Sequence, residues 1–267
     1  MAMDQPFNQE IFLPARASLL HYHDERELVI RWCRDINAYS KKLIFSCHRI
    51  NASTDVHDQL QQHLEILADR LVKINEISDS IHFPTYKSTI SNCIEELIEG
   101  FTFYYYILYR QILPYNKFLS IIDQMISQQK VSVVDLFKIN DVCQDYHCKF
   151  IFEGDYFMGL FDLTGEIMRY SITNLIDSNT NQLNPDVTLN LSFLQSFHSF
   201  LLDLFINYPN LNVNRGQFSI DYDSKNCANI KKKIETFNQS LNKVQSMVLD
   251  ICIRGNEFNL HQIQDNI

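Results

Sequence analysis

Two pairs of acidic residues have the types and the spacing that could do chemistry in this chain. Asp162 and Glu166 are four residues apart, and Glu96 and Glu99 are three apart, so in a helix each pair projects from one face. Four carboxylates that converge repel one another, and a divalent cation relieves the repulsion. Oxygen ligands suit Mg²⁺ or Mn²⁺, which activate water and stabilise phosphate charge in phosphodiester hydrolysis. The pairs predict a metal-dependent hydrolytic site, provided that the fold brings them together.

The segment 154–170 is predicted to form a helix with two opposed faces. Its apolar face carries Tyr156, Leu160, Leu163, Ile167 and Tyr170. Its other face carries Asp155, Gly159, Asp162, Glu166 and Arg169. A simply solvated acidic face, with Glu166 and Arg169 as a weak exposed ion pair, is the alternative interpretation. Gly159 and Gly165 each cost roughly 1 kcal/mol of helix stability relative to Ala, so close packing or close approach of a substrate would explain them.

A second helix, predicted from about Thr85 to Ile112, carries the other acidic pair. From Phe101 to Tyr109 it is apolar or aromatic nearly all the way round, with Thr102 as the exception, which predicts burial on every side. Glu96 and Glu99 stand where this helix turns inward. A carboxylate pair in that position is harder to explain as solvated surface.

Long helices are expected in the rest of the chain as well. The 267 residues include only six Gly and six Pro, and 46% are hydrophobic, which is enough for a full core. Helical periodicity runs from about Ser18 to Ile50, through a leucine seam over 60–74 and through an apolar segment over 189–206. A long seam over 227–251 would suit an oligomer interface as well as an internal core, and Gly255 is expected to end that helix. Shorter helical pieces are predicted at 117–127 and 133–139, and a loop at 207–219.

The charge of the chain is unusual for a protein that binds nucleic acid. The net charge is −9, so RNA contact would require strongly segregated charge or a partner that supplies positive surface. The densest basic stripe consists of Arg26, Arg31, Arg34, Lys41, Lys42 and Arg49. It is either a solvated face or a phosphate-contacting strip. The run Lys231–Lys233 favours a solvated basic turn over a nuclear localisation signal.

The cysteines indicate a reducing compartment. There are seven, an odd number, and they lack the spacing of a disulfide framework. Cys143, His147 and Cys148 invite a zinc hypothesis, but no fourth ligand has a recognised spacing, so zinc is not expected. The polar N-terminus predicts no secretory signal, and no run approaches 18 apolar residues, so no membrane span is expected.

Several stretches resemble the Trax branch of the translin family. The most specific is Asp-Leu-Thr-Gly-Glu at 162–166. It is preceded by Gly-Asp-Tyr-Phe-Met-Gly-Leu-Phe and followed by Ile-Met-Arg. Further matches lie at 23–29, 34–36, 48–50, 95–99 and 253–255, so the resemblance covers about residues 20–257. Residues 113–150 match poorly, and the chain lacks the bipartite basic signal that some members carry near the N-terminus.

This resemblance implies an all-α fold, a single-domain bundle of about seven long antiparallel helices. We expect an irregular arm over 1–17, the helical domain over 18–257 and a tail over 258–267. The resemblance also implies the catalytic subunit of a metal-dependent endoribonuclease, assembled with translin in a hetero-oligomer. Its substrates would be single-stranded or nicked RNA, as in passenger-strand removal during RNA silencing and in tRNA fragment processing. It would act in the cytoplasm, with the nucleus as an additional location and no membrane association.

The same resemblance assigns the residues. Glu96, Glu99, Asp162 and Glu166 match the family's catalytic quartet and would bind Mg²⁺ or Mn²⁺. RNA contacts are predicted for Arg34, Lys41, Lys42, Arg49 and Arg169, although Arg169 also suits an ion-pair role. The alternative is a non-enzymatic scaffold that stabilises translin in a nucleic-acid-binding complex. A di-iron oxidase is disfavoured, because no Glu-x-x-His motif accompanies the carboxylates.

Overall fold

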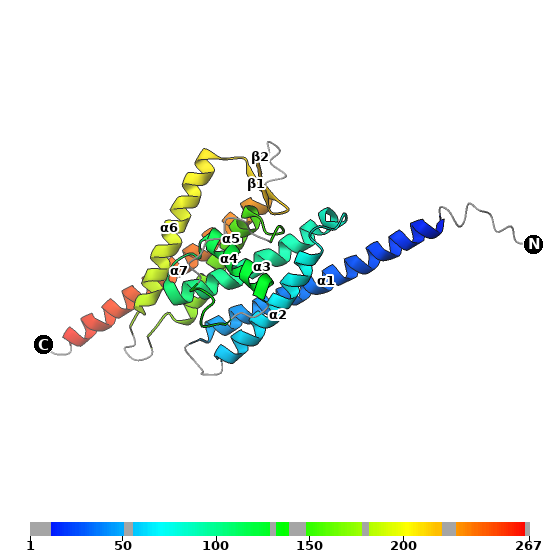
Figure 1. Ribbon diagram of the computed structural model, residues 1–267. Coiled ribbons are helices and arrows are strands. Elements are labelled where there is room, and N and C mark those ends of the chain that lie inside the picture. Colours follow the sequence, from blue (N-terminus) through cyan, green and yellow to red (C-terminus); the bar gives the residue numbers. More distant parts are fainter. Residues whose placement is uncertain are drawn as a thin grey trace, which may run out of the picture. The chain divides into compact units, whose positions relative to one another are not determined.

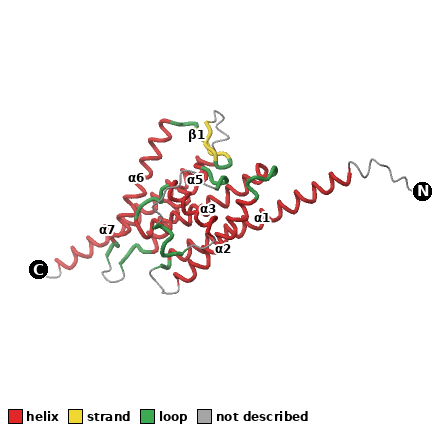
Figure 2. The backbone as a smooth tube through the Cα atoms, viewed as in Figure 1, coloured by secondary structure: helices red, strands yellow, loops and turns green. Residues whose placement is uncertain are grey.

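The computed structural model describes residues 12–50, 56–128, 132–138, 148–177, 182–220 and 228–264, with the side chains of 228 and 254–264 left out. The described part contains seven helices and one hairpin (Figure 1). These are α1 (Leu13–His48), α2 (Val56–Glu76), α3 (Phe83–Tyr109), α4 (Tyr115–Gln128), α5 (Glu153–Thr173), α6 (Pro185–Asn207), β1 (Leu211–Asn214), β2 (Gln217–Ile220) and α7 (Ala228–Gln264). The all-α class is therefore confirmed, and Figure 2 shows how small the strand content of the described residues is.

The chain packs as two compact units. The first comprises Met1–Leu97 and Leu113–Phe152, and the second comprises Ile98–Ile112 and Glu153–Ile267. The first unit therefore holds α1, α2, α4 and the beginning of α3. The second holds the end of α3, all of α5, α6 and α7, and the hairpin.

The core of the first unit lies where α2 packs between α1 and α4. The predicted seam of α2 is confirmed, since all of its members are fully buried: Leu60, Leu64, Leu67, Leu71 and Ile74. An ion pair of 2.6 Å between Arg70 Nε and Asp35 Oδ2 joins α2 to α1. Helix α1 begins at Leu13, earlier than the expected Ser18. Pro14 permits this start, because the first turn of a helix does not need its missing N–H.

The core of the second unit lies among α5, α6 and α7. The ring of Phe197 on α6 is 5.8 Å from that of Phe237 on α7 and 6.4 Å from that of Phe161 on α5. The predicted seam of α7 is buried at Ile230, Phe237, Leu241 and Val244. The helix does not end at Gly255 as expected but continues to Gln264. The part of the predicted seam at Cys227 lies outside the described residues.

Helix α3 is buried all round over 101–106, as predicted, but its last turn is not. Leu108 and Tyr109 are 46% and 47% exposed. The helix also ends at Tyr109 instead of Ile112, because Arg110 adopts a left-handed conformation with φ 56°. A left-handed residue cannot continue a right-handed helix.

Two segments differ from their predicted secondary structure. Residues 133–137 form turns, not the expected helical piece. The expected loop 207–219 contains an antiparallel hairpin in which Asn214 pairs with Gln217. Its two turn residues, Arg215 and Gly216, have φ of 50° and 76°. Positive φ at both central positions is typical of a type I′ turn, which suits the twist of two-residue hairpins.

The tip of this hairpin is seated on the beginning of α5. The backbone N–H of Gly154 donates a hydrogen bond of 2.9 Å to the carbonyl oxygen of Gly216. A Cβ atom at Gly154 would lie 2.4 Å from that oxygen, and one at Gly216 would lie 2.5 Å from the carboxylate of Asp155. By contrast, a Cβ atom at Gly165 would meet nothing within 4 Å. Close packing therefore explains Gly154 and Gly216 but not Gly165.

Alanine substitutions at two glycines of α5 should have opposite effects on stability. Gly154→Ala forces the hairpin backbone away and should lower the free energy of unfolding by about 1–3 kcal/mol. Gly165→Ala should raise it by up to about 1 kcal/mol, because alanine favours the helix and the space is open. Urea unfolding followed by circular dichroism measures both. A Gly154→Ala variant as stable as the parent chain would contradict this packing.

Candidate carboxylate site on α5

The polar face of α5 is largely buried. Asp155 is fully buried and Glu166 is 6% exposed, whereas Arg169 at the end of the face is exposed. Asp162 lies between these extremes, with 38% of its side chain exposed. The interpretation as a simply solvated acidic face is therefore wrong for Asp155 and Glu166. Buried carboxylates need positive charge or hydrogen-bond donors close by.

Helix α7 supplies positive charge to Asp162. The ammonium group of Lys233 donates hydrogen bonds to Asp162 Oδ2 at 2.6 Å and to the carbonyl oxygen of Met158 at 3.1 Å. Met158 lies one turn before Asp162, so a single ammonium group bridges two oxygens of the same helical face.

Two of the other predicted ligands also contact basic side chains. Glu166 Oε1 lies 3.0 Å from Arg169 Nη1, so the predicted pair exists, with a buried carboxylate and an exposed guanidinium. Glu96, on the part of α3 that belongs to the first unit, has its Oε2 3.4 Å from Lys41 Nζ. Sequence analysis missed the Lys41 contact, because it joins residues far apart in the chain.

Glu99 is buried and belongs to the second unit together with Asp162 and Glu166. It lies one turn before Phe103, and Glu166 lies one turn before Tyr170. The rings of Phe103 and Tyr170 meet edge to face with centroids 6.2 Å apart. Because residues four apart share a helical face, Glu99 and Glu166 lie on the faces through which α3 and α5 meet.

The four predicted ligands have the chemical type that a hard divalent cation prefers. They supply carboxylate oxygens, which Mg²⁺ and Mn²⁺ prefer, and Glu99 and Glu166 are buried. Within the described ranges, no three His, Cys, Asp or Glu side chains form a group that could hold a metal ion. In the conformation described, the positive charge beside Glu96, Asp162 and Glu166 comes from Lys41, Lys233 and Arg169.

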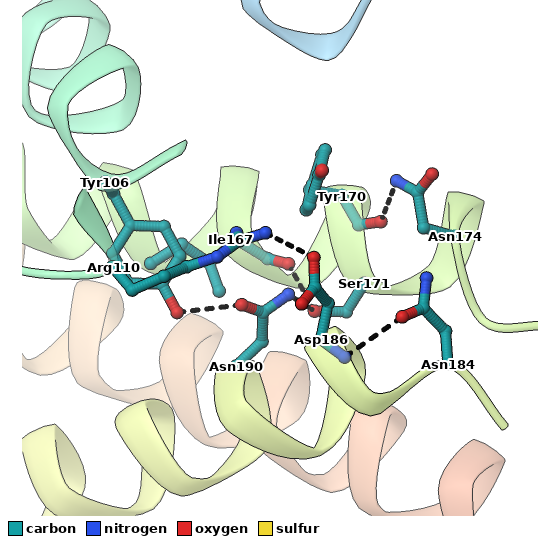
Figure 3. A network of polar contacts seen from close by, with 9 residues as sticks. All are labelled: Tyr106, Arg110, Ile167, Tyr170, Ser171, Asn174, Asn184, Asp186 and Asn190. Carbon is teal, nitrogen blue, oxygen red and sulfur yellow. Dashed lines mark hydrogen bonds and ion pairs between the residues drawn. The ribbon is translucent and has the colours of Figure 1, made fainter. Parts of the chain in front are cut away.

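A buried polar network fixes α5 one turn beyond Glu166 (Figure 3). The hydroxyl of Tyr106 on α3 donates to Asn190 Oδ1 on α6 at 2.8 Å, and Asn190 Nδ2 donates to Ser171 Oγ on α5 at 3.0 Å. Ser171 Oγ in turn donates to the carbonyl oxygen of Ile167 at 2.7 Å. The network thus joins α3, α5 and α6. In the sequence, this network is indicated only by the polar residue Asn190 within an apolar helix.

Arg110 forms a second link at the same place. Its guanidinium pairs with the carboxylate of Asp186 at the start of α6. The same guanidinium lies over the rings of Tyr106 and Tyr170, 5.8 Å and 5.6 Å from their centroids. Burial raises the pKa of Tyr106, so this phenol stays a neutral donor.

The predicted RNA-contacting residues on α1 and directly after it are all exposed: Arg34, Lys41, Lys42 and Arg49. Besides the pairing of Lys41, the ammonium of Lys42 lies 4.1 Å from the ring centroid of Tyr39. The guanidinium of Arg49 lies 5.3 Å from that of Phe45. These cations are accessible, and their contact with RNA stays a prediction.

Cys148 is the described member of the cysteine–histidine cluster. Cys143 and His147 lie outside the described residues. Cys148 is buried, and burial raises the pKa of its thiol to about 12, with the charge of Asp123 adding to the effect. A thiol with that pKa is protonated near neutral pH in the metal-free chain.

Comparisons with known proteins agree on one family. Residues 24–255 match the translin family. Translin-associated protein X of Pongo abelii is 24% identical over 254 residues, which are 91% of this chain and 78% of the relative. Its homolog in Schizosaccharomyces pombe is 27% identical over 202 residues, 71% of each protein.

Solved structures show the same fold. The crystal structure of AfC3PO has a TM-score of 0.56 at 15% identity and covers 91% of this chain and 97% of that one. Apo-NeC3PO has a TM-score of 0.52 at 16% identity, covering 90% and 96%. AfC3PO has also been solved in complex with duplex RNA, and that structure gives a TM-score of 0.53 at 16% identity, covering 91% and 97%.

Removing the Tyr106 hydroxyl should destabilise the protein in a pH-dependent way. Tyr106→Phe leaves a buried Asn190 oxygen without its donor, which costs about 1–3 kcal/mol. In the parent chain, the pKa of Tyr106 is higher in the folded state than in the unfolded state, where it is about 10. The phenol therefore contributes fully to the free energy of unfolding below about pH 10, and this contribution is lost as the pH rises above that value. Urea unfolding at pH 8 and about pH 10.5 should show the difference between parent and variant shrinking. A constant difference would contradict the assignment.

Proposed function

Because the chain belongs to the translin family, we propose that it is the catalytic subunit of a metal-dependent endoribonuclease that cleaves single-stranded or nicked RNA. One observation carries the proposal. The family-like stretch 162–166 forms part of a helix in which Asp155, Asp162 and Glu166 are buried or paired with basic side chains instead of being left in solvent. The likeness to translin-associated protein X and to a structure solved with RNA supports it.

The proposed ligands are Glu96, Glu99, Asp162 and Glu166, and they would hold Mg²⁺ or Mn²⁺. When bound, such an ion supplies an activated water and stabilises negative charge on the phosphate. Around them the chain contributes rigidity and charge. The Tyr106–Asn190–Ser171 network holds α5 in place one turn beyond Glu166. The side chain of Arg169 is 65% exposed, so its guanidinium can reach a phosphate from the edge of the acidic face.

Assembly with translin is the second part of the proposal. Helix α6 is long and apolar enough to cross a membrane by length and composition, yet only 22% of its most apolar stretch is buried inside the chain. Its exposed apolar side chains include Leu189, Phe200, Leu202 and Ile206. The helix also carries the hydrogen-bonded Asn190 and an exposed Asp203, which lipid would not tolerate well. A protein partner is therefore the better cover for these side chains.

The scaffold hypothesis is the alternative, and the paired carboxylates give it some support. Glu96, Asp162 and Glu166 each contact a basic side chain in the chain itself, as a purely structural charge cluster would. The two hypotheses differ in metal dependence. RNA cleavage that appears with Mg²⁺ and disappears with a chelator would exclude the scaffold.

Neutralising the proposed ligands should abolish activity without affecting assembly. Asp162→Asn and Glu99→Gln should each slow cleavage of single-stranded RNA by the purified hetero-oligomer by at least about a hundredfold. Each substitution removes a negative charge that would bind the divalent cation, and this cation would stabilise the charge on the reacting phosphate. Glu235→Gln, which changes an exposed carboxylate of α7, is the matched control and should not affect the rate. Cleavage that survives both ligand substitutions would rule out this site.

A charge among the exposed apolar side chains of α6 should weaken assembly with translin. Ile206 is 77% exposed, and Ile206→Asp should weaken co-assembly with translin by more than about tenfold, since burying such a side chain contributes about 1.5–3 kcal/mol. Ile81→Asp is the control, because Ile81 lies in the first unit and is 88% exposed. Size-exclusion chromatography with light scattering measures the complex. Equal assembly by both variants would show that α6 is not the interface.

A further inference from the structure

Lys233 differs from the two lysines that precede it. The sequence favours one solvated basic turn over Lys231–Lys233, and Lys231 and Lys232 are indeed exposed. Lys233 is not, because only 22% of its side chain is accessible and its ammonium group reaches α5. The prediction of a solvated turn is therefore wrong for this one residue.

The ammonium of Lys233 occupies a position suited to a cation. It lies 2.6 Å from the carboxylate of Asp162 and 3.1 Å from the carbonyl oxygen of Met158. Two cations within a few ångströms of one carboxylate repel each other, and partial burial weakens the screening of that repulsion by water. The ammonium and a divalent ion on Asp162 are therefore expected to exclude each other.

We propose that Lys233 is an internal competitor for the divalent cation. It holds the Asp162 carboxylate in the metal-free chain and leaves it when Mg²⁺ or Mn²⁺ binds. Lys233 is thus a positioning residue, which keeps Asp162 ordered and lowers the affinity of the site for metal. This inference rests on the proposed function, since it assumes that Asp162 is a metal ligand.

Mn²⁺ binding to the full chain, measured by electron paramagnetic resonance without RNA, tests the proposal independently of activity. Lys233→Met keeps the aliphatic stem and removes the charge, so it should tighten Mn²⁺ binding by about fivefold, the equivalent of losing one partly exposed ion pair. Lys233→Arg retains the charge and should stay closer to the parent chain. Lys232→Met, which changes the exposed neighbour, should leave the affinity unchanged.

Asp162→Asn separates the two ways in which the idea can fail. If this variant binds Mn²⁺ as well as the parent chain, Asp162 is not a ligand, and both the metal site and the competitor role are wrong. If it loses Mn²⁺ binding while Lys233→Met binds no tighter than Lys232→Met, the metal site stands and the competitor role alone is overturned.

A second measurement needs no variant and therefore does not depend on the folding of Lys233→Met. Amine acylation of the parent chain, quantified by mass spectrometry with and without Mg²⁺, reports the accessibility of each lysine. The proposal expects acylation of Lys233 to rise when Mg²⁺ is added, while that of Lys231 and Lys232 stays the same. An unchanged or lower reactivity of Lys233 would overturn it.

Discussion

The second unit depends on one constraint: carboxylates of α5 are buried or partly buried, and each needs a stabilising contact. A buried carboxylate without a partner costs several kcal/mol, so each one must be matched by its surroundings. Asp155 lies against the tip of the hairpin, Asp162 pairs with Lys233, and Glu166 pairs with Arg169. The hairpin can approach the start of α5 this closely only because neither Gly154 nor Gly216 has a Cβ atom.

This constraint connects the structure with the proposed chemistry. The positive charge that stabilises these carboxylates can come from basic side chains or from a divalent cation. Carboxylate oxygens can bind either one. The resting chain uses lysine and arginine. In our proposal the active state replaces the lysine on Asp162 by Mg²⁺ or Mn²⁺, while the network around Asn190 keeps α5 in place. In the same proposal, the exposed apolar side chains of α6 would contact a partner, whose surface would also supply the positive charge for RNA that a chain of net charge −9 lacks.

Local pattern was sufficient to predict much of this architecture. The leucine seam of α2 and the all-round burial of 101–106 each follow from spacing within one helix. What could not be predicted depends on contacts between distant segments. Three consecutive lysines look alike in sequence, and only the rotation of α7 against α5 decides that Lys233 turns inward. The Tyr106–Asn190 hydrogen bond spans 84 positions, and the hairpin depends on Arg215 adopting a positive φ that its residue type does not favour.

The most direct test of the account is a crystal structure of the chain in its assembly, grown with Mn²⁺ and measured at the manganese absorption edge. We expect an anomalous peak from a manganese ion bound to the proposed carboxylates, Asp162 among them, with Lys233 Nζ no longer within hydrogen-bond distance of Asp162. A structure saturated with Mn²⁺ that shows no peak at these carboxylates, and Lys233 still bound to Asp162, would contradict it.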